Sequence, residues 1–406
     1  MKDLCIFTYS FPYGKSEEFL YPEIFKLSKY YKTIHLFPLT NHGSTINRVL
    51  PENIVVHEFK QEKPVKSAAF YRQYASLILK AFNDELLNGA HFFKHLSNFK
   101  YYLAHFTNAC YQAECLNNYL EKKQILNSVF YSYWFNDWVY YLSILKYKKK
   151  ISNLITRIHG GDVYEYQHSE KNFFFPFRNF QVKQLDKIAA ISEDGREHLK
   201  KHYPASEKKI IVCRLGTSDH GNGILLKKEE AFTLVSCSTF FPYKNVALIP
   251  KIISCLKFKV NWIHFGEGGP DKERVEELIK TLPQNIKVEF KGYTEQKDLF
   301  EFYRNNYIDL FINTSISEGL PVSLMEAISF SIPVMAPNVG GIKELVNPTT
   351  GILFTHKQKT EELADRITAL HNASLKFNRA DIRNFWELNF SEKNYLNFHT
   401  AILCAA

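Results

Sequence analysis

The chain has 406 residues, of which 45% are hydrophobic and 23% are charged, and its mean hydropathy is −0.26, which excludes an intrinsically disordered protein. Lys and Arg exceed Asp and Glu by seven within residues 1–150 and by only two in the rest of the chain. This basic first half could face an anionic membrane, an acidic substrate or nucleic acid, or could be a solvated lysine-rich surface. Because no nucleic-acid-binding motif accompanies the charge, we expect no nucleic-acid partner.

Short β-rich apolar runs alternate with amphipathic stretches along the whole chain, which is the pattern of βα units built on a parallel sheet. The runs form two groups, separated by Gly-Asn-Gly at 221–223 and a charged segment at 227–230. We therefore predict two α/β domains, 1–224 and 225–385, and a final helical segment, 386–406. The predicted strands are residues 4–8, 33–39, 129–133, 154–158, 187–191 and 210–213 in the first domain, and 233–237, 260–265, 286–290, 310–313 and 332–336 in the second.

Two stretches of the first domain need separate interpretation. Residues 60–125 are rich in Phe, Tyr and Lys and lack turn signals, which predicts helices. Their aromatic residues, with Lys94 and Lys100 beside them, could rest on a membrane surface, although an aromatic stripe at helical spacing is more often core. Residues 124–145 are the best candidate for a membrane span, but polar residues interrupt them, and we predict a strand followed by a helix that begins at Asn136.

The seven cysteines are scattered through apolar segments and include no Cys-x2-Cys pair. This favours reduced, buried thiols in a cytoplasmic protein over disulfides or zinc ligands. The apolar run at residues 4–7 is too short for a signal peptide.

The most informative segment is Asn313-Thr-Ser-Ile-Ser-Glu-Gly-Leu-Pro-Val-Ser-Leu-Met-Glu326, which leaves a strand, turns at Gly319 and enters a helix with Pro321 suited to its first turn. The N-terminus of a helix attracts anions, so a diphosphate is expected there. Glu318 and Glu326 bracket this helix start, and their backbones lie at most about 12 Å apart, comparable to the length of a sugar nucleotide from hexose to ribose. Taken alone, such a pair is more often a capping acid and a solvent-facing acid.

This segment resembles the Glu-x7-Glu signature of glycosyltransferase family four, whose members are retaining glycosyltransferases with the GT-B fold. The resemblance continues through Ser331-Ile-Pro-Val-Met-Ala-Pro-Asn-Val-Gly-Gly341 and Thr350-Gly-Ile-Leu-Phe. It implies two Rossmann-like parallel-sheet domains that face each other across a cleft, the first binding the acceptor and the second the donor, with the last helix crossing back to the first domain. It also implies that Glu318 contacts the transferred sugar, that Glu326 contacts the ribose, and that the intervening main chain binds the diphosphate, namely Gly319, Leu320, Pro321 and Val322.

Two further segments of the second domain resemble the same family. Val235-Ser-Cys-Ser-Thr239-Phe-Phe-Pro-Tyr-Lys244 is similar to a loop that brings an arginine and a lysine to the leaving diphosphate, where a cation suits the charge that develops. Lys244 matches the lysine and is assigned a catalytic role, whereas the donor-binding position Thr239 stands where the arginine is usual. His264-Phe-Gly266-Glu-Gly268 lacks the dinucleotide-binding spacing and resembles the family's loop near the donor nucleotide. Gly292, after the next strand, lies where the family's main chain reaches the base.

Two segments of the first domain complete the resemblance. Thr156-Arg-Ile-His159-Gly-Gly-Asp162 is similar to a His-Gly-x-Asp element, although a lone histidine after a strand is often only a hydrogen-bonded loop residue. It implies that His159 positions the donor sugar in a catalytic role and that Asp162 orders the loop or contacts the acceptor. After the first strand, Gly14 lets the backbone approach the donor, and Lys15 is assigned to the acceptor.

Together these residues predict a retaining, metal-independent transfer of a sugar from a nucleotide-sugar donor, which is a substrate and not a cofactor, to a glycan or lipid-linked glycan. The sequence contains no Asp-x-Asp element, so no metal is expected. The family implies surface polysaccharide or glycolipid assembly in the cytoplasm or on the inner face of the membrane, with an anionic membrane surface as a candidate partner of the basic half. Two alternatives stay open: a GT-B sugar-nucleotide epimerase, and a non-catalytic saccharide- or nucleotide-binding protein, which Thr239 favours.

Overall fold

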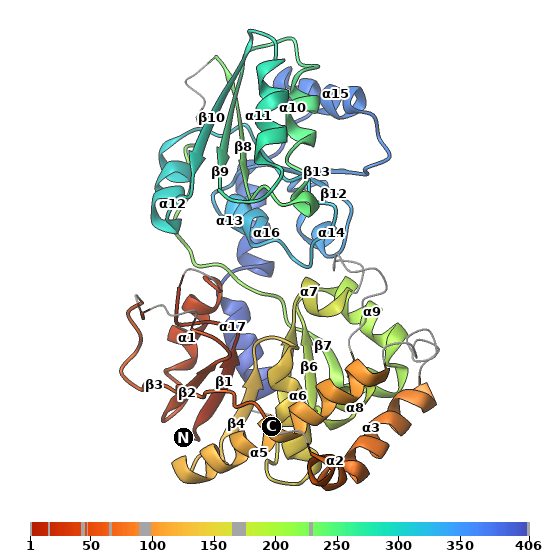
Figure 1. Cartoon of the computed structure of the whole chain (residues 1–406). Helices are drawn as coiled ribbons and strands as arrows, with labels where there is room; N and C mark the ends of the chain where they lie inside the picture. Colours follow the sequence, from red (N-terminus) through yellow and green to blue (C-terminus); the bar gives the residue numbers. More distant parts are fainter. Residues whose placement is uncertain are drawn as a thin grey trace. The chain divides into compact units, whose positions relative to one another are not determined.

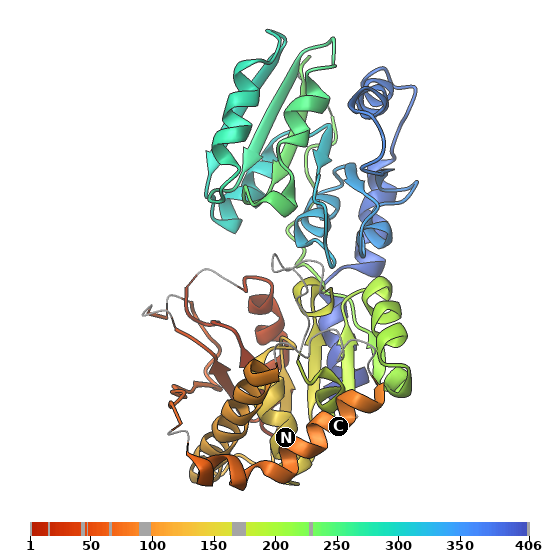
Figure 2. The same cartoon turned by 45° about the vertical axis from the view of Figure 1, so that its right-hand side comes forward.

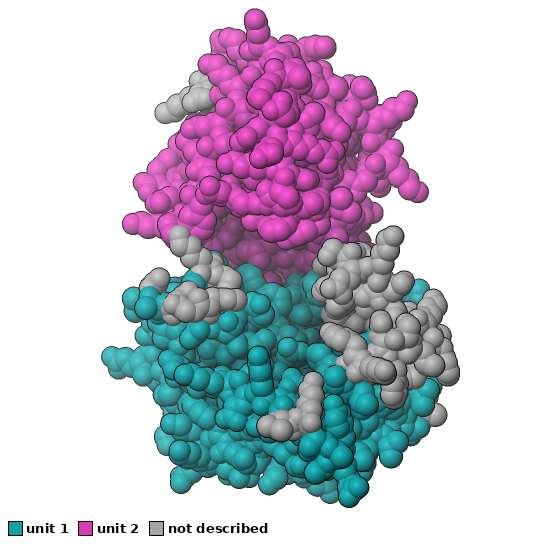
Figure 3. All heavy atoms as spheres, in the orientation of Figure 1, with its two compact units in different colours: residues 1–213, 395–406 teal, residues 214–394 magenta. Residues whose placement is uncertain are grey.

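The protein is described by a computed structural model that divides into two compact units. Unit 1 comprises residues 1–213 and 395–406, and unit 2 comprises residues 214–394 (Figure 3). The division follows the last strand of the first sheet, about ten residues before the boundary that the sequence analysis placed at 224/225. The residues described are 2–14, 17–41, 45–46, 48–64, 67–88, 99–164, 176–226 and 230–403.

Unit 1 contains a seven-stranded parallel sheet in the order β3-β2-β1-β4-β5-β6-β7 (Figure 1). Its central strands β1, β2, β4 and β5 are buried along their whole length, as expected for a parallel sheet covered on both faces. The strand order reverses between β1 and β4, which makes this pair the topological switch point. The strands are β1 Leu4–Thr8, β2 Ile34–Pro38, β3 Ile54–Val56, β4 Val129–Ser132, β5 Ile155–Ile158, β6 Lys187–Ala190 and β7 Ile210–Val212.

The two faces of this sheet bury two separate cores because successive side chains of a strand point to opposite faces. In β1, Cys5 and Phe7 belong to one cluster and Leu4 and Ile6 to the other. The helices that cover the faces are α1 Leu20–Leu27, α2 Ala68–Gln73, α3 Ala75–Asn88, α5 Phe99–Lys123, α6 Asp137–Tyr147, α7 Gly160–Val163, α8 Arg178–Gln184 and α9 Glu193–His202, followed by the 3-10 turn η3 Pro204–Lys209.

The helical prediction for residues 60–125 is confirmed by α2, α3 and α5, and Figure 2 shows α3 running across the outside of unit 1. Tyr102 and Phe106 of α5 are buried in the core, which supports the core interpretation of the aromatic stripe at those positions. Lys94 lies outside the described residues. The predicted strand and helix in residues 124–145 are also confirmed, as β4 and α6, and the Asn136 side chain caps α6 by accepting from the Trp138 N–H.

Unit 2 contains a six-stranded parallel sheet in the order β10-β9-β8-β11-β12-β13, the same arrangement, with its switch point between β8 and β11. Two of the strands in the described part of the chain, β3 and β13, were not predicted as strands. The strands of unit 2 are β8 Phe232–Cys237, β9 Val260–Phe265, β10 Ile286–Gly292, β11 Leu310–Ile312, β12 Val334–Pro337 and β13 Gly351–Phe354. Its helices are η4 Pro242–Lys244, α10 Leu248–Ile253, α11 Lys272–Lys280, α12 Gln296–Asn305, α13 Val322–Ser329, α14 Ile342–Leu345, α15 Thr360–His371 and α16 Arg379–Asn389.

The C-terminal segment forms two helices where one was predicted over 386–406, and its last residues belong to unit 1, the domain to which it was predicted to cross back. Helix α16 ends at Asn389 and packs in unit 2, where the Trp386 indole donates a 2.7 Å hydrogen bond to Thr217. A separate helix, α17 Lys393–Phe398, continues into the π-helical turn His399–Leu403, and residues from Tyr395 onward belong to unit 1.

Candidate functional site

Three loops follow β8, β9 and β10 at the carboxyl edge of the sheet in unit 2, and their backbones hold one another in place. The Phe240 N–H donates to the Gly268 carbonyl (2.7 Å), and the Gly266 N–H donates to the Gly292 carbonyl (2.8 Å). Gly266 has a φ of +125°, and a Cβ atom there would lie 2.0 Å from the carbonyl oxygen of Ser238. Only glycine permits so close a backbone approach. The predicted donor-binding glycines of these loops therefore lie together.

The side chain of His264, in β9, fixes the loop that follows β8. Its Nδ1 lies 2.7 Å from Ser236 Oγ, and its Nε2 lies 3.1 Å from the Ser238 carbonyl oxygen. Burial lowers the pKa of His264 to about 4, so the ring is neutral and Nε2 donates to that carbonyl. Thr239 is the next residue after Ser238, so the backbone that carries its half-buried side chain is held in place by His264.

The loops after β8 and β11 meet at the switch point of unit 2 and bring Lys244 and Glu318 together. Lys244 Nζ lies 2.6 Å from Glu318 Oε1, and the side chains are 22% and 12% exposed respectively. The same carboxylate oxygen accepts a 2.7 Å hydrogen bond from Ser315 Oγ. Burial opposes the charge on Lys244, but the Glu318 carboxylate outweighs this effect and raises the pKa of Lys244. The lysine is therefore a fixed cation at neutral pH.

Backbone contacts hold this ion pair in place. The Thr314 hydroxyl lies within hydrogen-bond distance of the carbonyls of Lys244 (3.1 Å) and Asn245 (3.0 Å). The Ile316 N–H donates a 2.7 Å hydrogen bond to the Tyr243 carbonyl. Because these hydrogen bonds join the two loops through their main chains, the backbone positions that carry Lys244 and Glu318 are held relative to each other.

Helix α13 follows the Glu318 loop directly and carries the second carboxylate. It begins at Val322 with Pro321 as its N-cap, so Pro321 precedes the helix and does not lie in its first turn as predicted. Glu326 is buried and accepts a 2.7 Å hydrogen bond from Gln296 Nε2 of α12. Burial and, as a smaller effect, the negative charge of Glu326 raise the pKa of Cys237 to about 12. Glu326 therefore lies within electrostatic reach of Cys237 at the end of β8.

The turn after β12 fixes the backbone between these two carboxylates. Gly340 has a φ of +52°, and a Cβ atom there would lie 1.8 Å from the Glu318 carbonyl oxygen. The neighbouring Gly341 N–H donates a 2.8 Å hydrogen bond to the Gly319 carbonyl. Leu320 is buried, so the start of α13 is anchored in the core as well.

In unit 1, His159 directly follows β5 and lies among aromatic rings. Its Nε2 lies 3.2 Å from the Tyr133 carbonyl oxygen, and its ring centroid lies 4.2 Å from that of Trp134. Burial and the nearby Arg157 charge lower the pKa of His159 to about 3. The ring is therefore neutral at physiological pH, and Nε2 donates to the carbonyl.

Asp162 orders the loop after β5, which is one of the two roles predicted for it. Its carboxylate accepts hydrogen bonds of 3.2 Å from the N–H groups of His159 and Phe135. Gly14 lies in the loop after β1 with a left-handed φ of +63°. Lys15 lies outside the described residues.

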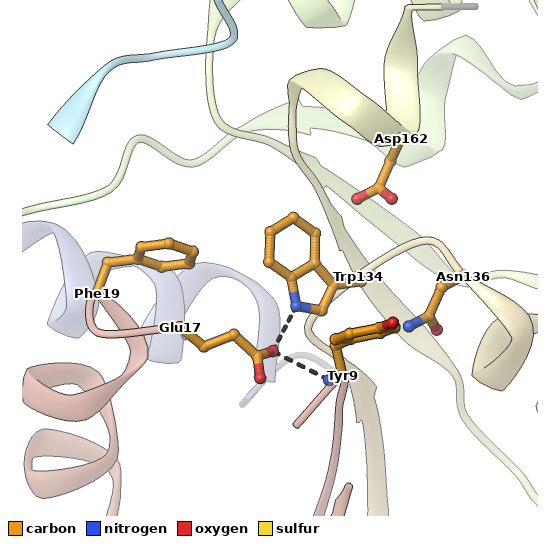
Figure 4. Close-up of a pocket in the computed structure, with 6 residues that line it drawn as sticks. All are labelled: Tyr9, Glu17, Phe19, Trp134, Asn136 and Asp162. Atoms are coloured by element: carbon orange, nitrogen blue, oxygen red, sulfur yellow. Dashed lines mark hydrogen bonds between the residues drawn. The ribbon is translucent and has the colours of Figure 1, made fainter. Parts of the chain in front are cut away.

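Sequence reasoning missed Glu17, whose carboxylate lies at the end of β1. It accepts hydrogen bonds from the backbone N–H groups of Tyr9 (3.0 Å), Ser10 (2.7 Å) and Phe11 (2.6 Å) and from the Trp134 indole. Figure 4 shows the carboxylate pointing toward the indole nitrogen and the Tyr9 backbone. A pocket of about 400 Å³ lies beside it, lined by Tyr9, Glu17, Phe19, Trp134, Asn136 and Asp162.

Comparison with known proteins identifies the architecture. Residues 222–384 match the model of the family Glycosyl transferases group 1. The lipopolysaccharide outer core galactosyltransferase WaaB, in its apo form, superposes with a TM-score of 0.68 at 12% identity over 100% of both chains. HepE from Anabaena, in complex with UDP, gives a TM-score of 0.65 at 15% identity over 100% of both chains. The chain has the GT-B fold, and residues 222–384 are similar to the group 1 family.

Curated relatives match shorter parts of the GT-B chain. One subunit of the phosphatidylinositol N-acetylglucosaminyltransferase of Homo sapiens is 30% identical over 154 residues, which cover 37% of this chain and 31% of that protein. The chain spans less than two thirds of the length of the curated relatives it matches.

The GT-B topology explains which predicted residues come together. In open parallel sheets, ligands bind at the carboxyl ends of the strands beside the switch point. Lys244, Glu318 and Ser315 converge at that place in unit 2, and His159 and Asp162 lie beside the switch point of unit 1. Among the described residues, no cluster of three or more His, Cys, Asp or Glu side chains is arranged to hold a metal ion. None of the helices in the described segments is long and apolar enough to cross a membrane.

Proposed function

We propose that this chain transfers a sugar from a nucleotide-sugar donor to a hydroxyl group of a glycan or lipid-linked glycan, with retention at the anomeric carbon and without a metal ion. The observation that carries the proposal is the ion pair between Lys244 and Glu318 at the switch point of unit 2, next to the start of α13. A fixed cation and a helix N-terminus suit a diphosphate, and a nearby carboxylate suits sugar hydroxyls.

Each residue then has a defined role. Lys244 and the first turn of α13 stabilise the negative charge that develops on the leaving diphosphate. Glu318 accepts hydrogen bonds from hydroxyls of the transferred sugar, and Glu326 accepts them from the ribose. Donor binding exchanges the contact between Lys244 and Glu318 for contacts of each with the substrate, so neither charge is left buried without a partner.

Retention is proposed to follow from attack on the same face that the diphosphate leaves. The bond between the anomeric carbon and the phosphate oxygen breaks, the acceptor oxygen bonds to that carbon, and the acceptor proton passes to the leaving phosphate. No protein nucleophile is required. His159 positions the donor sugar as a neutral ring, since its low pKa prevents it from serving as a cation near neutral pH.

The comparisons support a choice of substrates to test first. HepE is described in complex with UDP, so uridine nucleotides are the first donors. WaaB is named for lipopolysaccharide and the human relative for phosphatidylinositol, which supports acceptors of surface polysaccharide or glycolipid assembly. An anionic membrane on the cytoplasmic side is the proposed partner of the basic first half, and binding to anionic liposomes should fall as salt rises.

The deciding experiment is a screen of UDP-, GDP-, ADP- and TDP-sugars with mass detection of the product, run with and without EDTA. We expect acceptor-dependent turnover that EDTA leaves unchanged and Glu318→Ala abolishes. Turnover that EDTA abolishes would contradict metal independence, and inversion at the anomeric carbon would contradict retention. Release of nucleoside diphosphate without an acceptor, together with an epimerised sugar, would favour an epimerase. Binding of nucleotides without any turnover would favour a non-catalytic binding protein.

A further inference from the structure

The pocket of unit 1 is built by loops that follow three neighbouring strands. Tyr9 and Glu17 follow β1, Trp134 and Asn136 follow β4, and Asp162 follows β5. Its volume of about 400 Å³ is near the lower end for ligand pockets, which suits a single sugar ring better than a whole nucleotide sugar.

Aromatic side chains supply the apolar part of this pocket. Tyr9 is 46% exposed, and Trp134 and Phe19 are partly exposed, with their ring centroids 6.0 Å apart in an edge-on arrangement. The Trp134 ring also packs against His159. The face of an aromatic ring is electron-rich and attracts the weakly positive C–H bonds that line one face of a pyranose ring.

The charge of the pocket selects against anions. Its charged residues, Glu17 and Asp162, are both acidic, and none of the six described lining residues is a lysine or arginine. His159, which packs against Trp134, adds no positive charge near neutral pH, because burial and the Arg157 charge lower its pKa to about 3. Among the described lining residues, the only charged groups that a phosphate or diphosphate would meet are acidic, and they would repel it.

Asn136 supplies an unused hydrogen-bond donor. Its Oδ1 accepts from the Trp138 N–H at 3.1 Å, whereas its Nδ2 is buried and has no hydrogen-bond partner among the described residues. A buried amide nitrogen normally has a partner, so its position on the pocket wall points to an oxygen acceptor from a ligand.

Glu17 holds the two aromatic walls of the pocket in place and does not act on the ligand as a general base. Its two oxygens are occupied by three backbone N–H groups and by the Trp134 indole. It adopts a left-handed φ of 59°, an unusual conformation for a glutamate. By joining the backbone of Tyr9 to the indole of Trp134, this carboxylate fixes the spacing of the two aromatic walls, and Glu17 is a positioning residue.

We propose that this pocket binds one pyranose ring of the acceptor, uncharged or bearing an amino group, packed against Tyr9 and Trp134 with its oxygens toward Asn136 and Asp162. The assignment rests on the proposed glycosyl transfer, which makes unit 1 the acceptor side. It also separates two parts of a lipid-linked acceptor, because the sugar enters this pocket and the diphosphate stays outside it.

The test is equilibrium binding of simple sugars to the full-length protein, followed by saturation-transfer difference NMR. The probes are methyl glycosides of neutral hexoses, N-acetylhexosamines and hexosamines, with methyl glucuronide and geranyl diphosphate as anionic probes. We expect at least one uncharged or amino sugar to bind, and binding to weaken at least tenfold in Tyr9→Ala and in Trp134→Ala. Tyr147→Ala, which removes a 41% exposed tyrosine from α6, is the matched control and should bind as the unmodified protein does.

Three results would overturn the proposal: no sugar binds, binding is unaffected by both aromatic substitutions, or an anionic probe binds best in a manner that depends on Tyr9 and Trp134. Glu17→Gln adds a readout for positioning, because it should weaken sugar binding and shift the fluorescence of Trp134 together. UDP titrations of the same preparations keep the two proposals apart. Nucleotide binding without sugar binding would overturn only the pocket assignment, whereas sugar binding without nucleotide binding or turnover would overturn only the transferase.

Discussion

At the switch point of unit 2 a lysine and a glutamate from two loops face each other, whereas at the switch point of unit 1 a glutamate from the first loop occupies the end of β1. The strand order around both points is the same. In unit 2 glycines allow the loop backbones to approach one another closely, and the largely buried cation Lys244 is held by its ion pair with Glu318. In unit 1 the backbone N–H groups that could have met an anion are already bound by Glu17.

In open parallel sheets the topology determines where ligands bind, and the residues of the loops determine the chemistry of that place. The same edge of a parallel sheet carries a fixed lysine beside the start of a helix in one unit and an acidic, aromatic pocket in the other. Four substitutions test the comparison, in order of decreasing expected effect.

Glu318→Gln tests the ionic site of unit 2. It removes the carboxylate that pairs with Lys244 while keeping the side-chain shape, so turnover should fall on the order of 100- to 1,000-fold. Initial rates of product formation measured by mass spectrometry check this. Glu289→Gln, on the exposed edge strand β10, should leave the rate unchanged. Equal rates for Glu318→Gln and the unmodified protein would show that the ion pair between Lys244 and Glu318 has no part in the mechanism.

Gly340→Ala tests whether activity requires the present backbone position of the loop after β11, which carries Glu318. The new Cβ would lie 1.8 Å from the Glu318 carbonyl oxygen, so the loop must shift, and turnover should fall on the order of tenfold to 100-fold. Gly221→Ala is the control, because Gly221 also has a positive φ, +89°, but no atom lies within 4 Å of the added Cβ. It should cost about 1 kcal/mol in stability and little activity. Matching losses in both variants would show that backbone strain alone matters.

His159→Phe tests the neutral histidine of unit 1 through the pH dependence of stability. The folded pKa of His159 is about 3 against an ordinary value of 6.5, so the unfolded state binds the proton first as pH falls. The contribution of the neutral His159 ring to the free energy of unfolding is complete above about pH 6.5 and declines as the pH falls toward 3. Between pH 7 and 5 the unmodified protein should lose about 2 kcal/mol more unfolding free energy than the variant. Urea titrations at both pH values check this, and parallel losses would place the pKa near its ordinary value.

Thr239→Arg tests how far unit 2 can be made more cationic. A second cation beside the diphosphate should add about 1 kcal/mol and tighten UDP binding roughly fivefold. Thr239→Gln, which adds length without charge, should leave the affinity unchanged. Calorimetric titration at two salt concentrations checks both, since the gain from arginine should shrink as salt rises. An unchanged affinity in Thr239→Arg would mean that the loop does not direct residue 239 toward the phosphates.

Sequence patterns were sufficient for the architecture because parallel strands buried on both faces are continuous apolar runs. The strand that was not predicted in unit 1, β3, is apolar but has only three residues and is partly exposed, so its run is too short to indicate a buried strand. β13 begins with Gly351, which carries no side chain to mark a strand, although the resemblance included it. The C-terminal segment was predicted as one helix, and the break at 390–392 depends on contacts with Gly216 and Thr217 that its own sequence does not reveal.

For the candidate site, the motifs that resemble the family identified Lys244, Glu318 and His159, each of which lies in the segment that follows a strand. Their mutual geometry was not readable from spacing, since the pairing of Lys244 with Glu318 joins residues 74 positions apart. Glu17 could not be found at all. Its role depends on three backbone N–H groups and an indole that only the folded loop assembles, and a glutamate near a helix start is commonly just a favourable terminal charge.

The return of residues 395–403 to unit 1 has a consequence for the order of folding. Phe398 lies 4.0 Å from the guanidinium of Arg157, whose charge is paired with Glu23 in the interior, and the Tyr395 hydroxyl donates to the Phe19 carbonyl beside the pocket. Unit 2 is a continuous stretch of chain, but unit 1 lacks part of its core until residues 395–403, which follow all of unit 2, have been synthesised. The unit whose synthesis begins first is therefore the unit whose core is completed second.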